Sequence, residues 1–265
     1  GFSLAFNILK PTSPAKLVGT AKQFREEYDT TIVFANDFEP SSKTIYDTNF
    51  DTELTCQDIH TLDITKIPSM DILTGGFPCQ SWSIAGKRLG FEDERANVFL
   101  TLINIIRYHK PRCVLFENVK NLTTHNNGQS FQTVLDYIKD SGYYVKYKVL
   151  NTCTMTSIPQ NRERVFIACF LDNVLADEFE FPEPVEQLVH IQQYLETDIP
   201  DKYYYNNRFA VWDDIKDAIP NHISTGTVYQ YRRGIVRENK SNVCPTLTAN
   251  LGMGGHNVPL IRDDN

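Results

Sequence analysis

The stretch Asp71-Ile72-Leu73-Thr74-Gly75-Gly76-Phe77-Pro78-Cys79 decides the fold that we expect for this chain. A short apolar run that ends in glycines and then a Pro-Cys pair is typical of a strand leaving the edge of a sheet, and ligands collect at such edges in open α/β folds. Proline fixes the backbone angle just before the cysteine, and glycine lets the chain turn and a substrate come close. The Cys79 thiol is therefore a candidate nucleophile on a constrained loop. The alternative is a buried cysteine that acts as a small hydrophobic residue.

On both sides of this stretch, strands and helices alternate at the spacing of βαβ units. Strands are expected at residues 31–35, 71–74, 113–116, 143–150 and 164–170, and helices at 2–9, 15–27, 95–109 and 130–139. Gly142 suits the C-terminal cap of the last helix. The pattern predicts an α/β fold with a mostly parallel sheet. After Phe170 the periodicity weakens, and we expect a small, irregular second domain with no clear core of its own.

Composition is that of a globular protein, with 265 residues, 41% of them hydrophobic and 22% charged. No run of about 18 apolar residues is present, so no membrane span is expected, and the first residues lack the features of a secretory signal. The six cysteines form no Cys-x-x-Cys pair. We therefore expect reduced thiols in a cytosolic protein, without disulfides or a metal site.

The charge is unevenly distributed along the chain. The net charge of −7 argues against a generic nucleic-acid coat, which would be basic. Residues 172–201 hold nine acidic residues and no Lys or Arg, whereas residues 229–240 hold four basic residues and one acidic residue. The second segment is a candidate surface for phosphates.

Polar residues follow several of the expected strands at the point where each strand meets a loop. Cys79 follows one strand, Glu117 ends a later one, and Arg162 and Arg164 lead into the last. A thiol, a carboxylic acid and a guanidinium around one pocket suit nucleophilic attack on a conjugated heterocycle; a buried Glu-Arg ion pair is the alternative. Asp37 ends the second strand, where nucleotide-binding folds hold ribose hydroxyls, although a solvated turn aspartate is also common.

In these residues the chain resembles the DNA cytosine-5 methyltransferases of the prokaryotic restriction-modification type. Gly76-Phe77-Pro78-Cys79-Gln80, Glu117-Asn118-Val119 and Gln160-x-Arg162-x-Arg164 match that family's three most specific motifs in order. The resemblance is close over residues 1–170 and resumes over 245–261. It implies a Rossmann-like sheet with helices on both faces, built to bind S-adenosyl-L-methionine, and a small irregular target-recognition domain.

The resemblance also implies roles for individual residues. Cys79 would attack carbon 6 of a cytosine flipped out of duplex DNA, Glu117 would hydrogen-bond the ring nitrogen and the exocyclic amine, Arg164 would hold the carbonyl oxygen, and Arg162 would support the site. Residues 80–95 resemble the mobile loop that closes over the base. The cofactor-binding residues implied are Gly1, Phe2, Asp37, Phe38, Asp58, Ile59, Pro78 and Val98, and the DNA-binding residues are Gln80, Ser83, Lys87, Arg232, Arg233, Arg237 and Thr246.

The same resemblance assigns residues 1–170 to a catalytic and cofactor-binding domain, 171–244 to a target-recognition domain and 245–265 to a return segment. It implies duplex DNA as substrate, a cognate restriction endonuclease as a partner system, and a monomer in the cytoplasm near the nucleoid. Two departures stand out. The chain starts at what resembles the last glycine of the family's first motif, and the family's final motif is absent after Asn265. We therefore expect these residues to be part of a longer protein.

Three other readings remain open. The chain can be an RNA cytosine methyltransferase of the same fold, although the long variable region with its Tyr and Arg content favours a DNA-reading domain. It can be a non-catalytic, DNA-binding member, although Cys79, Glu117 and Arg164 are all present. A nucleotide-dependent oxidoreductase is disfavoured because no full Gly-x-Gly-x-x-Gly motif is found.

Overall fold

The computed structural model describes residues 3–8, 30–78, 98–185, 190–196, 198–219, 227–232, 234–239, 243–248 and 258–262, with the backbone alone for residues 3–8 and for Arg232. The chain divides into two compact units. Unit 1 consists of Gly1–Val149 and Arg164–Phe181, and unit 2 consists of Leu150–Glu163 and Pro182–Asn265. The helix expected at residues 15–27 lies outside the described residues.

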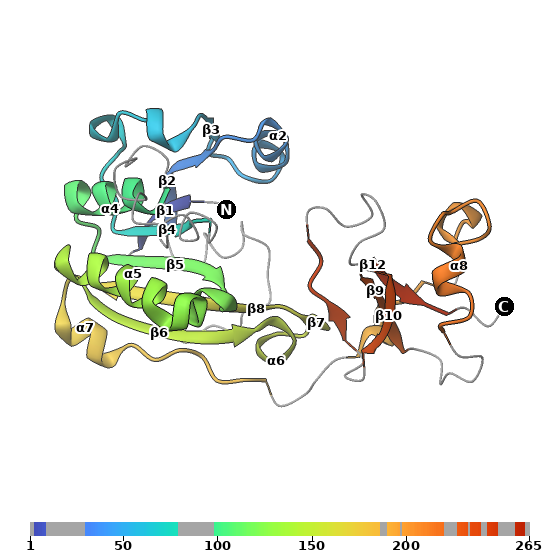
Figure 1. Ribbon diagram of the computed structural model, residues 1–265. Helices are drawn as coiled ribbons and strands as arrows, with labels where there is room; N and C mark the ends of the chain where they lie inside the picture. The colour runs from blue at the N-terminus through green and yellow to red at the C-terminus, as the bar shows by residue number, and fades with distance from the viewer. Residues whose placement is uncertain are drawn as a thin grey trace. The chain divides into compact units, whose positions relative to one another are not determined.

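Unit 1 is built on a seven-stranded sheet in the order β3-β2-β1-β4-β5-β8-β6, which Figure 1 shows with helices around it. The strands expected from the sequence are all present. The bounds are β1 Ser3–Ile8, β2 Thr30–Asp37, β3 Thr55–Cys56, β4 Ile72–Gly76, β5 Cys113–Val119, β6 Tyr144–Asn151 and β8 Glu163–Phe170.

The sheet is mixed, so the expectation of a mostly parallel sheet is wrong. β2 pairs parallel with β3 and β4 with β5, but β1 is antiparallel to both β2 and β4, and β8 is antiparallel to β5. Sequence periodicity locates strands but carries no information about direction, which depends on the neighbour that each strand meets. Because β8 runs antiparallel to β5, Arg164 at the start of β8 pairs with Val119 at the end of β5.

The segment expected to form a helix at residues 2–9 is strand β1, and that expectation is also wrong. A short apolar run cannot be assigned to helix or strand by periodicity alone. In the strand conformation, Leu4 lies between Ala35 of β2 and Thr74 of β4. The backbone groups of β1 therefore find ladder partners on both sides, which a buried backbone requires.

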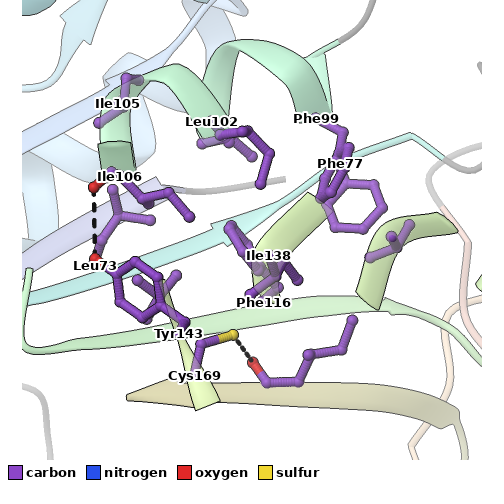
Figure 2. Close-up of a cluster of buried hydrophobic side chains, with 14 of the residues drawn as sticks. Leu73, Phe77, Phe99, Leu102, Ile105, Ile106, Phe116, Ile138, Tyr143 and Cys169 are labelled. Atoms are coloured by element: carbon purple, nitrogen blue, oxygen red, sulfur yellow. Dashed lines mark hydrogen bonds between the residues drawn. The ribbon is translucent and has the colours of Figure 1, made fainter. Parts of the chain in front are cut away.

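Helices cover both faces of the sheet. The main core joins α4 (Val98–His109) and α5 (Gln129–Asp140) to strands β4, β5 and β8, and Figure 2 shows side chains of this cluster. On the other face, Ala176 of α7 (Asn173–Glu178) packs with Ala168 and Phe170 of β8. Helix α2 (Pro40–Asn49) buries Tyr46 against Ala35.

Short helices and turns connect these elements. Gly142 follows α5 with φ of 91°, which confirms it as the residue that ends the helix in the left-handed region. The 3-10 helices of unit 1 are η1 Ile59–Thr61, η2 Ile64–Lys66, η4 Lys120–Thr123 and η5 His125–Gly128. Among the helices that the structure describes, none is both long and apolar enough to cross a membrane.

Unit 2 has a small core, contrary to the expectation from the sequence. Its three-stranded antiparallel sheet has the order β10-β9-β12, and Ile215, Tyr229, Tyr231 and Leu260 are buried together beside it. The residues of this core come from segments far apart in the chain. No single stretch of the sequence therefore shows the hydrophobic periodicity that would predict the core. The elements are α6 Thr152–Met155, β7 Gln160–Asn161, η6 Ile191–Tyr194, η7 Asp201–Tyr203, α8 Trp212–Ile215, β9 Val228–Arg232, β10 Ile235–Asn239, β11 Cys244–Pro245 and β12 Val258–Ile261.

Candidate active site

Three strand ends meet at one edge of the large sheet. Gly76 at the end of β4 pairs with Glu117 near the end of β5, and Val119 of β5 pairs with Arg164 at the start of β8. The ends of β4 and β5 lie at the same edge because these two strands are parallel. Arg164 lies at this edge although it starts β8, because β8 is antiparallel to β5. Cys79 lies outside the described residues, and the described chain leaves β4 at this edge through Phe77 and Pro78.

Glu117 and Arg164 form an ion pair across the neighbouring strands. Nε of Arg164 donates to Oε1 of Glu117 at 2.8 Å, and the side chains are 15% and 39% exposed, respectively. The sequence offered a buried Glu-Arg ion pair as the alternative; the pair forms, but the Glu117 side chain is not buried. Because the carboxylate is accessible and its second oxygen is not bound by this contact, the pair can also hold a polar ligand.

The chain that leads to Cys79 is anchored twice at Phe77. Nδ2 of the buried Asn118 donates to the Phe77 carbonyl oxygen at 2.7 Å. The Phe77 ring packs in the core, with centroids 4.8 Å from Phe99 and 5.9 Å from Phe116. These contacts fix the point where the chain leaves β4. In the sequence Asn118 was noted only as part of a motif; an amide directly after Glu117, at the end of an apolar strand, was the available signal.

A second group of expected residues gathers at the ends of β2 and β3. Asp37 pairs with Cys56, and the Gln57 N–H donates to the Asp37 carbonyl oxygen at 3.0 Å, which brings Asp58 to the same edge. Oδ1 of Asp37 accepts the Glu39 N–H at 2.9 Å. The structure therefore brings together, by backbone contacts, the segments that carry Asp37 and Asp58.

The apolar members of this group differ in exposure. The Phe38 ring is 73% exposed, directly after Asp37, whereas Ile59 is half-buried against the main core. Asp58 caps η1 by accepting the His60 N–H at 3.0 Å, and His60 Nδ1 lies 2.9 Å from Oγ1 of Thr101 on α4. The turn is thus attached to the body of unit 1. Of the other cofactor candidates, Val98 is half-buried and Pro78 exposed, and Gly1 and Phe2 lie outside the described residues.

Arg162 belongs to unit 2, where its backbone is held by the end of β6. The Arg162 N–H donates to Oδ1 of Asn151 at 3.0 Å, and the Thr152 N–H donates to the Arg162 carbonyl oxygen at 3.1 Å. Thr246 is attached to the same segment, since its Oγ1 donates to the Asn161 carbonyl oxygen at 2.7 Å. The structure thus places Thr246 beside the Gln160–Arg162 segment by a backbone contact.

Two of the expected DNA-reading arginines, Arg232 and Arg237, fall on one hairpin of unit 2. β9 and β10 pair antiparallel, with Arg232 opposite Ile235, and Gly234 in their connection has φ of 73°. Arg237 lies on β10 with an exposed side chain. Among the described residues, Arg237 forms no ion pair with the acidic residues between Glu183 and Asp201. Arg233, Gln80, Ser83 and Lys87 lie outside the described part of the chain.

Burial makes four other cysteines poor nucleophiles. It raises the pKa of Cys113 to about 11 and raises the pKa of Cys169, Cys153 and Cys244, because a desolvated thiolate is disfavoured. The thiolate is the nucleophilic form, so these side chains act in packing. No group of three or more His, Cys, Asp or Glu side chains that could hold a metal ion occurs within the described ranges.

Comparison with known proteins gives a consistent result. The family model described as C-5 cytosine-specific DNA methylase matches residues 17–261. The type II methyltransferase M.Bsp6I of Bacillus sp. (strain RFL6) is 40% identical over 234 residues, which cover 87% of this chain and 73% of that protein. M.NgoBI of Neisseria gonorrhoeae is 44% identical over 173 residues, covering 65% of this chain and 53% of that protein.

The fold has solved counterparts as well. The methyltransferase EhMeth of Entamoeba histolytica superposes with a TM-score of 0.54 at 20% identity, covering 69% of this chain and 56% of that one. At this identity the likeness shows the fold alone. The chain spans between about half and three quarters of the length of these three proteins.

Proposed function

This chain belongs to the C-5 cytosine-specific DNA methylase family, and from that premise we propose that it methylates carbon 5 of a flipped-out cytosine in a specific duplex DNA sequence. Enzymes of this family are S-adenosyl-L-methionine-dependent methyltransferases, and the named relatives are type II enzymes. The observation that carries the proposal is the Glu117–Arg164 ion pair, which lies at the sheet edge where the chain leaves Phe77 toward Cys79.

The residues at the ends of β2 and β3 suit S-adenosyl-L-methionine, which supplies an electrophilic methyl group. The Asp37 carboxylate accepts hydrogen bonds and is suited to ribose hydroxyls, and the exposed Phe38 ring offers a face on which adenine can stack. Asp58 and the half-buried Ile59 lie on the adjacent turn and would border the base. Val98 and Pro78 would complete this pocket, with Gly1 and Phe2 toward the methionine part.

Cys79 is the proposed nucleophile. Its thiolate would form a bond to carbon 6 of the cytosine, and the displaced electron pair would make carbon 5 nucleophilic. Glu117 would hydrogen-bond the ring nitrogen and exocyclic amine, and Arg164 the carbonyl oxygen, so that charge developing on the ring meets fixed partners. After methylation, loss of the carbon 5 proton returns the electron pair and breaks the carbon–sulfur bond. Arg162 would support the segment that precedes Arg164.

We assign DNA reading to residues 171–244, of which 182–244 belong to unit 2. The hairpin of β9 and β10 carries Arg232 and Arg237 and connects through Arg233, in the most basic segment of the region. Gln80, Ser83 and Lys87, in the loop after Cys79, and Thr246 would add contacts to the DNA. The naming of relatives as type II methyltransferases supports the proposal of a cognate endonuclease as the partner system. We further propose that the enzyme acts as a monomer near the nucleoid.

Methyl transfer by the full-length protein tests this proposal. The protein is incubated with labelled S-adenosyl-L-methionine and either mixed-sequence duplex DNA or transfer RNA, and bisulfite sequencing of DNA from expressing cells then locates the product. We expect label in duplex DNA at cytosines of one short sequence. Label in RNA alone would assign the chain to the RNA-modifying alternative, and label in neither would leave a non-catalytic member.

A further inference from the structure

Asn36 makes a buried contact that none of the roles above uses. Its side chain is 6% exposed, and Nδ2 donates to two carbonyl oxygens, that of Thr55 at 2.9 Å and that of Gln57 at 2.8 Å. Both acceptors belong to β3 and the turn that follows it, about twenty residues away in the chain. One amide group thus attaches the end of β2 to the next segment at two points.

The two attached segments carry the proposed cofactor residues. Asn36 directly precedes Asp37 and Phe38, and Gln57 directly precedes Asp58 and Ile59. Other polar contacts also join these segments: β2 and β3 pair in a short parallel ladder, the Cys56 thiol donates to the Phe38 carbonyl oxygen at 3.6 Å, and the Gln57 N–H donates to the Asp37 carbonyl oxygen at 3.0 Å. The Asn36 amide adds two side-chain hydrogen bonds to these contacts and so helps to hold the end of β2 beside the turn that carries Asp58.

The chemistry of the site requires a primary amide. An Asn NH₂ group has two N–H donors in one plane, whereas a serine hydroxyl has one and a carboxylate has none. Both acceptors are backbone carbonyls, which every residue carries. A substitution at Thr55 or Gln57 therefore cannot turn either acceptor into a donor. If the amide is removed, two partly buried carbonyl oxygens lose this partner, and polar groups away from water are costly to leave unpaired.

We propose that Asn36 is a positioning residue for the adenosine half of the cofactor. It would not touch the ligand. By holding the strand end that carries Asp37 at a fixed distance from the turn that carries Asp58, it would present the ribose-binding and adenine-binding groups together. This proposal rests on the proposed function, because the roles of Asp37 and Asp58 do.

Three variants of the full-length protein test the assignment. Asn36→Ala removes both donors, Asn36→Asp keeps the shape but faces two carbonyls with a carboxylate, and Asn49→Ala is the control. Asn49 is an exposed residue of α2 whose Nδ2 donates to the Ile45 carbonyl oxygen at 2.7 Å, so the control loses a local amide contact on the surface. The measurements are S-adenosylhomocysteine affinity by calorimetry, steady-state methylation kinetics and thermal melting.

We expect Asn36→Ala to weaken the affinity for S-adenosylhomocysteine about 10- to 100-fold, from the loss of one or two hydrogen bonds. The KM for S-adenosyl-L-methionine should rise with it, while kcat at saturating cofactor and the KM for DNA stay within about twofold, because a misplaced pocket weakens binding without touching the reacting atoms. A merely structural residue would instead lower kcat through the fraction of folded protein and leave both KM values unchanged.

Asn36→Asp keeps the test decisive if Asn36→Ala does not fold. At pH 8 its carboxylate should repel both carbonyls and reduce affinity at least as much as Asn36→Ala does. At pH 5.5 the carboxyl group should gain a proton and donate one bond, so affinity should recover in part relative to wild type at the same pH. Cofactor affinity equal to that of Asn49→Ala in both Asn36 variants would overturn the proposal. Reduced affinity in a protein whose wild type methylates no nucleic acid would instead count against the proposed function alone.

Discussion

Arg164 and Glu117 form an ion pair that is only partly buried. A partly exposed ion pair contributes about 0–1 kcal/mol to folding, and this carboxylate is 39% exposed. Both residues nevertheless lie at the edge where the chain leaves toward Cys79. The structure therefore predicts that changes here affect the reaction much more than the free energy of unfolding.

Arg164→Lys separates the contribution of this side chain to the reaction from its contribution to the free energy of unfolding. Lysine keeps the charge but lacks the planar fork of donors that can bind Glu117 and a carbonyl oxygen at once. We expect kcat/KM to fall by about 10- to 150-fold, the equivalent of one hydrogen bond to a charged group, and the free energy of unfolding to change by less than about 1 kcal/mol. Arg107→Lys on α4, where Nε donates to Ser141 Oγ at 3.0 Å, is the matched control. Equal kinetics in the two variants would remove Arg164 from the site.

Asp37→Ala tests the ribose contact. Loss of a hydrogen bond to a charged group should weaken cofactor binding by about 1.5–3 kcal/mol, while DNA affinity without cofactor hardly changes. Calorimetry measures the first and fluorescence anisotropy the second. Asp63→Ala is a close control, because Asp63 also accepts a nearby backbone N–H, that of Thr65 at 3.1 Å, in a turn outside the proposed site. Unchanged cofactor affinity in Asp37→Ala would exclude the carboxylate from the pocket.

The sequence predicts charged residues at strand ends better than the amides that position them. Glu117, Arg164 and Asp37 each follow or begin an apolar run, which is visible in a short window. Asn36 and Asn118 were missed as anchors because their partners lie 19 to 41 residues away, at Thr55, Gln57 and Phe77. An asparagine beside an apolar run looks the same whether it faces solvent or a distant carbonyl.

At the scale of elements, strand positions were predictable and strand directions were not. The apolar runs at 113–116 and 164–170 locate β5 and β8, but only their pairing, with Val119 opposite Arg164, shows that they are antiparallel. The same limit explains β1. Its apolar residues suit a helix or a buried strand, and the choice depends on the neighbours β2 and β4 rather than on the segment itself.

The prediction about DNA sequence specificity concerns the hairpin of β9 and β10. Arginine is the side chain that most often reads guanine, through a bidentate hydrogen bond in the major groove. Replacing a base-reading arginine by alanine should cost about 1–3 kcal/mol at the cognate site and relax preference at one base pair. A phosphate-contacting arginine should weaken all sequences alike and reduce the salt slope by about one unit. We expect at least one of Arg232, Arg233 and Arg237 to show the first signature.

Binding of each alanine variant to cognate and single-mismatch duplexes at two salt concentrations distinguishes these roles. Lys216→Ala is the control, because Lys216 on the same unit is already paired with Asp213 at 2.6 Å. If all three arginines only balance the acidic residues of the 172–201 stretch, none of the variants will differ from the control. That result would remove this hairpin from the DNA-contacting surface.

For the molecule as a whole, the buried thiols of the core predict a loss of stability at alkaline pH. Burial raises the pKa of Cys113 to about 11 from its ordinary value of 9.0, and it also raises the pKa of Cys169. The unfolded chain therefore releases these protons at lower pH than the folded chain. The stabilisation is fully present below about pH 9 and is lost as pH rises through the folded pKa.

Chemical denaturation at pH 8 and pH 10 measures this effect. Between pH 8 and pH 10, the free energy of unfolding of the wild type should fall by about 1 kcal/mol more than that of Cys113→Ala. The reason is that the variant lacks the Cys113 thiol, whose pKa differs between the folded and unfolded chain. Cys56→Ser, at an exposed thiol, should keep the pH dependence of the wild type. A Cys113→Ala protein with the wild-type dependence would show that this thiol does not contribute.

Covalent trapping tests the central claim, that Cys79 attacks a cytosine in DNA, most directly. Duplex DNA that contains 5-fluorocytosine at the cognate site is incubated with the full-length protein and S-adenosyl-L-methionine, and the products are separated under denaturing conditions. Fluorine cannot leave as a proton does, so the wild type should remain bonded to the DNA, whereas Cys79→Ser should fold and bind DNA but form no adduct. An adduct formed equally by Cys79→Ser, or none formed by a wild type that methylates the same site, would contradict the account.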